Sequence, residues 1–307
     1  MLMKEYRICM PLTVDEYRIG QLYMISKHSC EQSGGGEGVE VVRNEPSVHP
    51  EYGPGQLTEK RIYLSSKLPS WAKALVPRFF YVTETAWNFY PYTITEYSVS
   101  FLSKFSVRIE TRFENNNGDN DNVFGDTPTP AQKVSFLDIL SDPIPEKHYK
   151  TVEDLSLWQS SKTHRGPLGE GWRDNHKPIM CSYKRVQCSF EVYGFQTRTE
   201  EFIHKNIRDI LLVGHRQAVA WIDEWHGLSL DDVRDYEQTM QEKTNSKVKS
   251  ELNTGPPTAS RPVFSRSISV TDERSLMKMG VTTAAISDPP PSSSVPHIPI
   301  RLHSTPE

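Results

Sequence analysis

The chain has 307 residues, a formal net charge of −4 and an isoelectric point near 6.2. Such a weakly acidic chain lacks the strongly basic face that holds proteins on nucleic acid, so we expect no nucleic-acid partner. No apolar run approaches the roughly 20 residues that cross a bilayer, and the first ten residues lack the apolar segment of a secretory signal, so we expect a cytoplasmic protein.

The cysteines are not spaced like a zinc site or a redox pair. Cys9, Cys30, Cys181 and Cys188 include no C-x-x-C pair. In a cytoplasmic chain this spacing predicts reduced thiols. We therefore expect no disulfide, no metal and no cofactor.

The first predicted element is a helix over residues 14–27. It opens at TVDE, where the Thr13 side chain bonds forward to the helix and Glu16 reaches back to the cap. The glycine-rich stretch KHSCEQSGGGEGVE then ends the helical pattern.

Strands dominate the middle of the chain. The alternation of apolar and polar residues predicts them at residues 39–46, 60–65, 79–83, 88–97, 104–113, 134–140 and 182–193. Few helices separate these strands, whereas a parallel sheet needs a helix between successive strands. The pattern therefore favours a mostly antiparallel sheet and an α+β fold.

The last third of the chain contains two predicted helices and a tail. Apolar residues recur at helical spacing over residues 200–225, and SLDD at residues 229–232 caps a helix that runs to about residue 243. Beyond it the chain is rich in Ser, Thr and Pro and poor in aromatic residues. We expect one domain over residues 1–245 and a disordered tail over residues 246–307.

Polar side chains interrupt the apolar faces of three predicted strands. Alternation in KFSVRIETRF places Thr111 in a row with Ile109. Lys60 shares a face with Ile62, and Lys184 aligns with the apolar residues of KRVQCSFEV. Two lysines are thus predicted to face inward.

Two predicted helices carry the same anomaly. Gln21 falls in the apolar stripe that contains Tyr17 and Met24, and Glu237 falls in the stripe that contains Val233. Each of the five residues has a local explanation, because lysines reach water from strand ends and threonines bond to backbone. One polar object inside an apolar container explains all five together, and the cost of burying unpaired lysines indicates that it is anionic.

Long motifs resemble the phosphatidylinositol transfer protein family over about residues 1–245. They include KEYRICMPLTVDEY, GQLY, GGGEGVEVVRNEP, GQLTEKRIYL, SKLPSW, AWNFYPYTITEY, RGPLG, MCSYK, FIHK and WIDEW followed by LSLDDVR. The variant YPYTITEY and the Ser-rich tail are most similar to the cytoplasmic retinal-degeneration-B-type branch, the soluble class II members.

The resemblance implies a concave, mostly antiparallel sheet flanked by two long helices, similar to the START and plant-allergen folds, around one phospholipid. The residues that match the family's inositol contacts are Thr58, Lys60, Asn88 and Glu237. Those that match the positions around the phosphate are Gln21, Thr95, Thr111 and Lys184.

The same resemblance implies phosphatidic acid as a cargo beside phosphatidylinositol. Thr93 lies where the other branch has a cysteine, so it joins the predicted head-group residues. We expect this change to alter which head group or acyl chains the protein prefers. We interpret AWNFYPYTIT, residues 86–95, as a wall of the lipid cavity, aromatic along the acyl chains and polar at the head group.

The stretch EVYGF, residues 191–195, occupies the place where other members have a tryptophan pair. The resemblance implies that Val192, Tyr193 and Phe195 touch the bilayer, with the strength of this contact left open by the weaker aromatic content. The alternative is a plain hairpin turn around Gly194.

Two segments of the tail have an arginine three positions before a serine, Ser269 and Ser304. Such segments suit basophilic kinases and then 14-3-3 proteins, whose arginines bind phosphoserine. Arginine–serine spacing of this kind also arises by chance in a Ser-rich tail.

The implied function is a soluble carrier that transfers one phospholipid between membranes, with transient contact at their surfaces. The alternative is a lipid-sensing adaptor whose partner binding depends on the bound lipid and on tail phosphorylation. We expect no enzyme, because neither G-x-S-x-G nor H-E-x-x-H occurs.

Overall fold

The structure is a computed structural model that describes residues 1–34, 37–64, 68–73, 76–77, 80–192 and 194–252. The chain divides into two units, Met1–Pro257 and Thr258–Glu307, and every described residue belongs to the first. The predicted phosphorylation sites Ser269 and Ser304 lie outside the described residues.

An eight-stranded sheet forms the centre of the first unit, with the strand order β2-β3-β4-β5-β6-β8-β1-β7. All neighbouring strands are antiparallel except β1 and β7, so the expected mostly antiparallel α+β fold is confirmed. The strands are β1 (Leu2–Met10), β2 (Gly38–His49), β3 (Gly53–Tyr63), β4 (Val82–Asn88), β5 (Tyr92–Ser98), β6 (Phe105–Glu114), β7 (Val134–Leu137) and β8 (Met180–Phe190).

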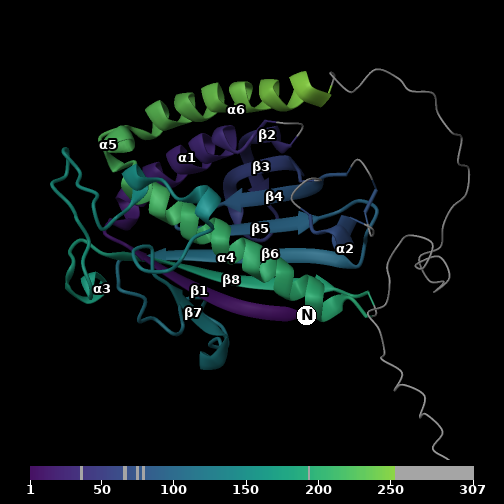
Figure 1. The fold of residues 1–307 in the computed structure, drawn as a ribbon, viewed down its shortest axis with the longest axis horizontal. Coiled ribbons are helices and arrows are strands. Elements are labelled where there is room, and N and C mark those ends of the chain that lie inside the picture. Colours follow the sequence, from purple (N-terminus) through teal and green to yellow (C-terminus); the bar gives the residue numbers. More distant parts are fainter. Residues whose placement is uncertain (35–36, 65–67, 74–75, 78–79, 193, 253–307) are drawn as a thin grey trace, which may run out of the picture. The chain divides into compact units, whose positions relative to one another are not determined.

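Three long helices accompany the sheet, together with shorter ones. Helix α4 crosses the sheet, while α1 and α6 pack side by side near its β2 end (Figure 1). The long helices are α1 (Val14–Glu31), α4 (Gln196–Ala220) and α6 (Leu230–Leu252). The short helices are α2 (Ser70–Lys73), α3 (Trp172–Asn175) and α5 (Ile222–Trp225), with 3-10 turns η1 (Ala131–Lys133), η2 (Glu146–His148) and η3 (Thr151–Glu153).

Side-chain caps start α1 and α6 where the sequence predicts them. Glu16 donates its backbone N–H to the Thr13 hydroxyl, and its carboxylate accepts the Thr13 N–H at 2.8 Å. Ser229 and Asp232 make the same reciprocal pair ahead of α6. Each cap satisfies backbone donors that the first helical turn leaves free.

Several predicted boundaries are wrong. The strand expected at residues 88–97 is a hairpin of β4 and β5, because Pro91 cannot donate to a ladder and lies in the turn. Of the strand expected at residues 79–83, residues 82–83 form the start of β4, and residue 79 lies outside the described residues. The helix expected to reach Trp225 ends at Ala220, where the chain turns into α5, and α6 continues nine residues past its expected end at 243. Strand β1 was not predicted.

The apolar core lies between β1, β8 and the C-terminal half of α4. Ile8 and Tyr183 come from adjacent strands, Leu212 comes from the helix, and all three are fully buried. Trp225 of α5 is also buried, and its indole N–H donates to the Ala218 carbonyl oxygen at 2.8 Å. The apolar core fills one part of the space between the sheet and the helices, and a cavity occupies another part.

Candidate functional site

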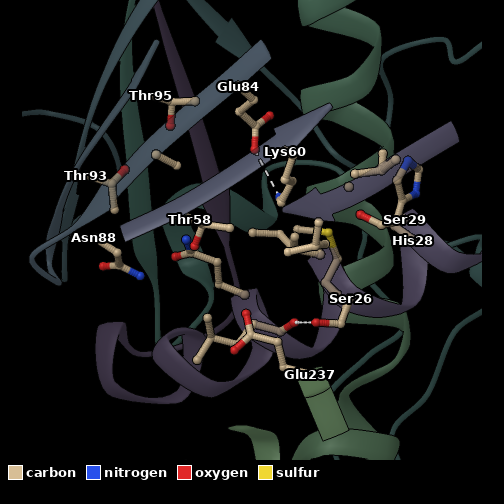
Figure 2. A pocket seen from close by; sticks show the side chains of 18 of the residues that line it. Ser26, His28, Ser29, Thr58, Lys60, Glu84, Asn88, Thr93, Thr95 and Glu237 are labelled. Carbon is tan, nitrogen blue, oxygen red and sulfur yellow. Dashed lines mark hydrogen bonds and ion pairs between the residues drawn. The ribbon is translucent and has the colours of Figure 1, made fainter. Parts of the chain in front are cut away.

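A cavity of about 310 Å³ opens between the face of the sheet and helices α1, α4 and α6. All the residues that the resemblance assigned to the head group line it. They are Gln21 on α1, Thr58 and Lys60 on β3, Asn88 on β4, Thr93 and Thr95 on β5, Thr111 on β6, Lys184 on β8 and Glu237 on α6. Figure 2 shows the labelled side chains of β3, β4 and β5 on the sheet side, with Glu237 on the helix opposite.

Strand register sets one row of polar side chains across this face. Five neighbouring strands pair Gln56 with Asn88, Asn88 with Thr93, Thr93 with Thr111, and Thr111 with Lys184. Directly paired residues of neighbouring strands point to the same face. The row therefore presents hydroxyls, amides and one ammonium group to a single ligand.

The next rows along the strands mix polar side chains with apolar ones. Two residues further, Thr58 pairs with Ala86, which pairs with Thr95, and this row continues into Ile109 and Val186. The row after it contains Lys60, Glu84 and Tyr97 and becomes apolar at Val107 and Cys188. The polar groups of these two rows therefore lie toward β3, and the apolar ones lie on β6 and β8.

Lys184 is the buried cation of this site. Its ammonium group donates to the Thr111 hydroxyl at 3.1 Å and lies 5.6 Å from the centroid of the Phe113 ring. Within the residues that the structure describes, no carboxylate forms an ion pair with it. Burial lowers the pKa of Lys184 to about 8. Lys184 lines the cavity, so an anionic ligand bound there would raise its pKa again.

Two other buried polar atoms near Lys184 have no hydrogen-bond partner. They are the Oε1 atom of Gln21 and the Nε2 atom of His215. The Nδ1 atom of His215 bonds to the Leu211 carbonyl oxygen at 2.6 Å, and the ring stacks on Tyr17. Burial and the nearby charge of Lys184 lower the pKa of His215 to about 3, which keeps the ring neutral. Unsatisfied buried polar atoms are rare, so these two residues of the cavity lining are candidates for contact with a ligand.

Lys60 is paired, in contrast to Lys184. Its ammonium group lies 3.0 Å from the Glu84 carboxylate, and both side chains are mostly buried. Tyr97, the next residue in this row, hydrogen-bonds to Glu84, and its pKa is raised well above 10 by burial and by that carboxylate. The expectation that Lys60 is an unpaired inward cation is wrong, because a carboxylate on the neighbouring strand neutralises it.

Glu237 is likewise part of an ion pair. Its carboxylate accepts from the Arg234 guanidinium at 2.5 Å, one helical turn earlier on α6. Both residues line the cavity. The cavity thus has two electrically different parts, one with the two ion pairs and one with the lone ammonium of Lys184.

Known protein sequences are similar to this chain over the residues that form the cavity. The family profile described as "Phosphatidylinositol transfer protein" matches residues 1–242. The chain belongs to the phosphatidylinositol transfer protein family. It is 56% identical over 308 residues to Cytoplasmic phosphatidylinositol transfer protein 1 of Homo sapiens, covering 100% of this chain and 91% of that protein.

Other relatives separate two branches of the family. Cytoplasmic phosphatidylinositol transfer protein 1 of Drosophila melanogaster is 58% identical over 249 residues, covering 80% of this chain and 91% of that protein. Membrane-associated phosphatidylinositol transfer protein 2 of Homo sapiens is 43% identical over 250 residues, covering 78% of this chain but 18% of that protein. The cytoplasmic branch predicted from YPYTITEY is in line with these identities.

Several residues that line the cavity escaped sequence reasoning. Glu84 and Gln56 line the cavity, and so does Asn44, whose Oδ1 atom accepts from Gln56 at 2.7 Å. Alternation along β3 could have found Gln56, which shares the face of Lys60. His215 gives no sequence signal, because a histidine in an apolar stripe is usually a satisfied core residue.

Most aromatic side chains of AWNFYPYTIT do not line the cavity. Trp87 and Phe89 stack on each other with ring centroids 5.8 Å apart, and both rings meet His49, the last residue of β2, edge to face. Tyr92 joins them through Tyr52. Residues 86–88, Thr93 and Thr95 do line the cavity, whereas Phe89, Tyr90 and Tyr92 are not among the lining residues, because pleat alternation turns Asn88 and Thr93 inward and Tyr92 outward.

The predicted membrane contact lies at the end of β8. Val192 and Phe195 are half-buried, and the Phe195 N–H donates to the Val192 carbonyl oxygen at 3.1 Å in a turn. Tyr193 lies outside the described residues. Contact of this turn with a bilayer stays a prediction.

Other site classes were searched within the described part of the chain. There, no group of three or more His, Cys, Asp or Glu side chains is arranged to hold a metal ion. No described helix is both long and apolar enough to cross a membrane. All four cysteines are buried and unbridged.

Proposed function

We propose that the protein is a cytoplasmic carrier that holds one phospholipid in the cavity and transfers it between membranes. The lone buried ammonium of Lys184, in a row of polar side chains that lines a cavity with both polar and apolar walls, carries this conclusion. Burying an unpaired cation is unfavourable, and the phosphate of a phospholipid supplies the missing anion. The names of the relatives, phosphatidylinositol transfer proteins, point to the same cargo.

Phosphatidylinositol is the first proposed cargo. Its phosphate binds at Lys184 with the hydroxyls of Thr93, Thr95 and Thr111 and the amide of Gln21. Its ring hydroxyls bind at Thr58, Lys60, Asn88 and Glu237. Phosphatidic acid is the second cargo, held by the phosphate residues alone because it has no ring.

Transfer needs no chemical step on the lipid. Covering the acyl chains removes a cost of about 0.8 kcal/mol per methylene, so the closed complex is stable in water. At a bilayer the chains move between two apolar surroundings, and this barrier largely disappears. We propose that the protein opens there during a transient contact through Val192, Tyr193 and Phe195, and that it is not an enzyme.

Two measurements test the carrier function. Native mass spectrometry of purified protein should show one phospholipid per chain, and labelled phosphatidylinositol should move from donor to acceptor vesicles at a rate that rises with protein concentration. A protein that contains lipid but does not increase transfer would be a sensor, and an empty protein would contradict both roles. No feature of the described residues favours the adaptor role.

Partner binding through the tail is a separate proposal. Phosphorylation at Ser269 or Ser304 adds negative charge beside arginine and creates a candidate 14-3-3 site. Pull-down of purified 14-3-3 by the kinase-treated chain should be lost when Ser269 and Ser304 are both changed to alanine. Equal capture by unphosphorylated protein would contradict this proposal.

A further inference from the structure

Lys60 is neutralised by the carboxylate of Glu84, whereas Lys184 has no such partner among the described residues. Lys60 and Glu84 are register partners on β3 and β4, their charged groups lie 3.0 Å apart, and both line the cavity (Figure 2). The Tyr97 hydroxyl is hydrogen-bonded to the same carboxylate. The Glu84 carboxylate is therefore fixed between the Lys60 ammonium group and the Tyr97 hydroxyl, and it neutralises Lys60.

Lys60 and Lys184 reach the cavity from the same face of the sheet, but from strands that are far apart in it. Strand β3 is separated from β8 by β4, β5 and β6 in the sheet. One cation has a carboxylate partner on the next strand, while the other has only the Thr111 hydroxyl. A lipid phosphate is therefore drawn to Lys184 in preference to Lys60.

We propose that Glu84 is a specificity-determining residue: by neutralising Lys60 it makes this part of the cavity accept the hydroxyls of a polyol head group and reject a second phosphate. This inference rests on the proposed phospholipid cargo. It deepens that function by assigning Glu84, which belongs to none of the matched head-group positions.

The chemistry of the two groups explains the preference. A hydroxyl both donates and accepts, so it can donate to the Glu84 carboxylate and accept from the Lys60 ammonium group. A phosphate on the ring only brings negative charge, about −1.5 to −2 near neutral pH. At Lys60 it would meet the Glu84 carboxylate, while Lys60 itself is already paired.

The test removes the carboxylate and measures which cargo the protein loads. Wild type and the Glu84→Gln variant are incubated with vesicles that contain equal amounts of phosphatidylinositol and phosphatidylinositol 4-phosphate with identical chains. Native mass spectrometry then gives the ratio of the two bound lipids. Wild type should load phosphatidylinositol in clear preference, and E84Q should raise the share of the 4-phosphate about tenfold, since one freed charge-assisted hydrogen bond is worth about that factor.

Two variants separate the ion pair from general charge effects. Glu96→Gln removes the same charge from the same sheet, but Glu96 pairs with Arg108 at an exposed site away from the cavity, so its ratio should match wild type. The double variant Lys60→Gln with Glu84→Gln removes the freed cation as well, and it should show no gain. If E84Q does not fold, Glu84→Ser replaces it, because the smaller side chain leaves room for water beside Lys60.

Each outcome bears on the proposal. Equal loading of both lipids by wild type overturns it, as does an unchanged ratio in the Glu84 variant. A gain of the same size in E96Q or in the double variant assigns the effect to another cause and also overturns it. Wild type that loads neither lipid contradicts the proposed function itself.

Discussion

The ammonium group of Lys184 lies 3.1 Å from the hydroxyl of Thr111, its register partner on β6. The pair forms the inner end of a polar row whose other members are Thr93, Asn88 and Gln56. Because a hydroxyl cannot neutralise an ammonium group, the site is incomplete without an anion. The following predictions start from this relationship.

Replacing Lys184 by methionine should separate cargo loading from stability. Loading of phosphatidylinositol and phosphatidic acid should both fall at least tenfold, because a charge-assisted hydrogen bond is lost. The empty protein should become more stable by about 1–3 kcal/mol, because a buried unpaired charge is removed. Native mass spectrometry and urea unfolding measure the two effects. The exposed Lys133→Met is the control, and unchanged loading in K184M would exclude Lys184 from the site.

The stability of the empty protein should depend on pH through Lys184. Burial lowers its folded-state pKa from 10.5 to about 8, so between these values the unfolded chain binds more protons. The free energy of unfolding should therefore rise with pH in this window, by at most about 1.4 kcal/mol per pH unit. Bound phosphatidylinositol should flatten the rise. Urea titrations across the window give the comparison, and identical profiles for wild type and K184M would contradict it.

Residues proposed to bind the inositol ring should affect phosphatidylinositol, which has that ring, and not phosphatidic acid, which lacks it. Thr58→Val keeps the side-chain shape and removes the hydroxyl, which should slow phosphatidylinositol transfer several-fold and leave phosphatidic acid transfer unchanged. Glu237→Gln should act in the same direction. Vesicle transfer of each lipid measures this, with Thr85→Val, two residues before Trp87 on β4, as the control away from the cavity. Equal loss of both cargoes would contradict the division between ring and phosphate residues.

The turn after β8 should affect docking rather than binding. Changing Tyr193 and Phe195 to serine should reduce the fraction of protein bound to vesicles and slow transfer, because apolar contact area is lost. The amount of lipid that copurifies should not change. Vesicle flotation with Leu157→Ser, an exposed apolar residue elsewhere, provides the comparison. Undiminished flotation would reject this contact site.

Close packing at Gly20 should make α1 sensitive to one added methyl group. A Cβ atom there would lie 2.8 Å from the Trp225 ring, whereas one at Gly169 would meet nothing within 4 Å. Gly20→Ala should therefore lower the free energy of unfolding by about 1–3 kcal/mol through overpacking, and Gly169→Ala should have little effect. Urea unfolding of both variants measures the difference, and equal stabilities would show that the ring can move aside.

Local sequence predicted the parts of the fold whose signals are local. The caps at Thr13 and Ser229 were predicted because a side chain and the backbone a few residues away form them. The inward faces of Thr111 and Lys184 followed from period-two alternation, and Gln21 and Glu237 followed from helical spacing. Motif resemblance supplied Asn88 and Thr95, beside a proline that interrupts the alternation.

Contacts between distant segments had to come from the tertiary structure. Alternation fixes the face of Lys60 but not its neighbour, and only the β3–β4 register brings Glu84 to it. The edge-to-face contacts of Trp87 and Phe89 with His49 also depend on which strand ends meet at the edge of the sheet. The sequence by itself determined which side chains face inward, because alternation and helical spacing are properties of neighbouring residues. The tertiary structure decided which of them are paired and which cation is left for a ligand, because ion pairs form between strands whose register depends on the whole sheet.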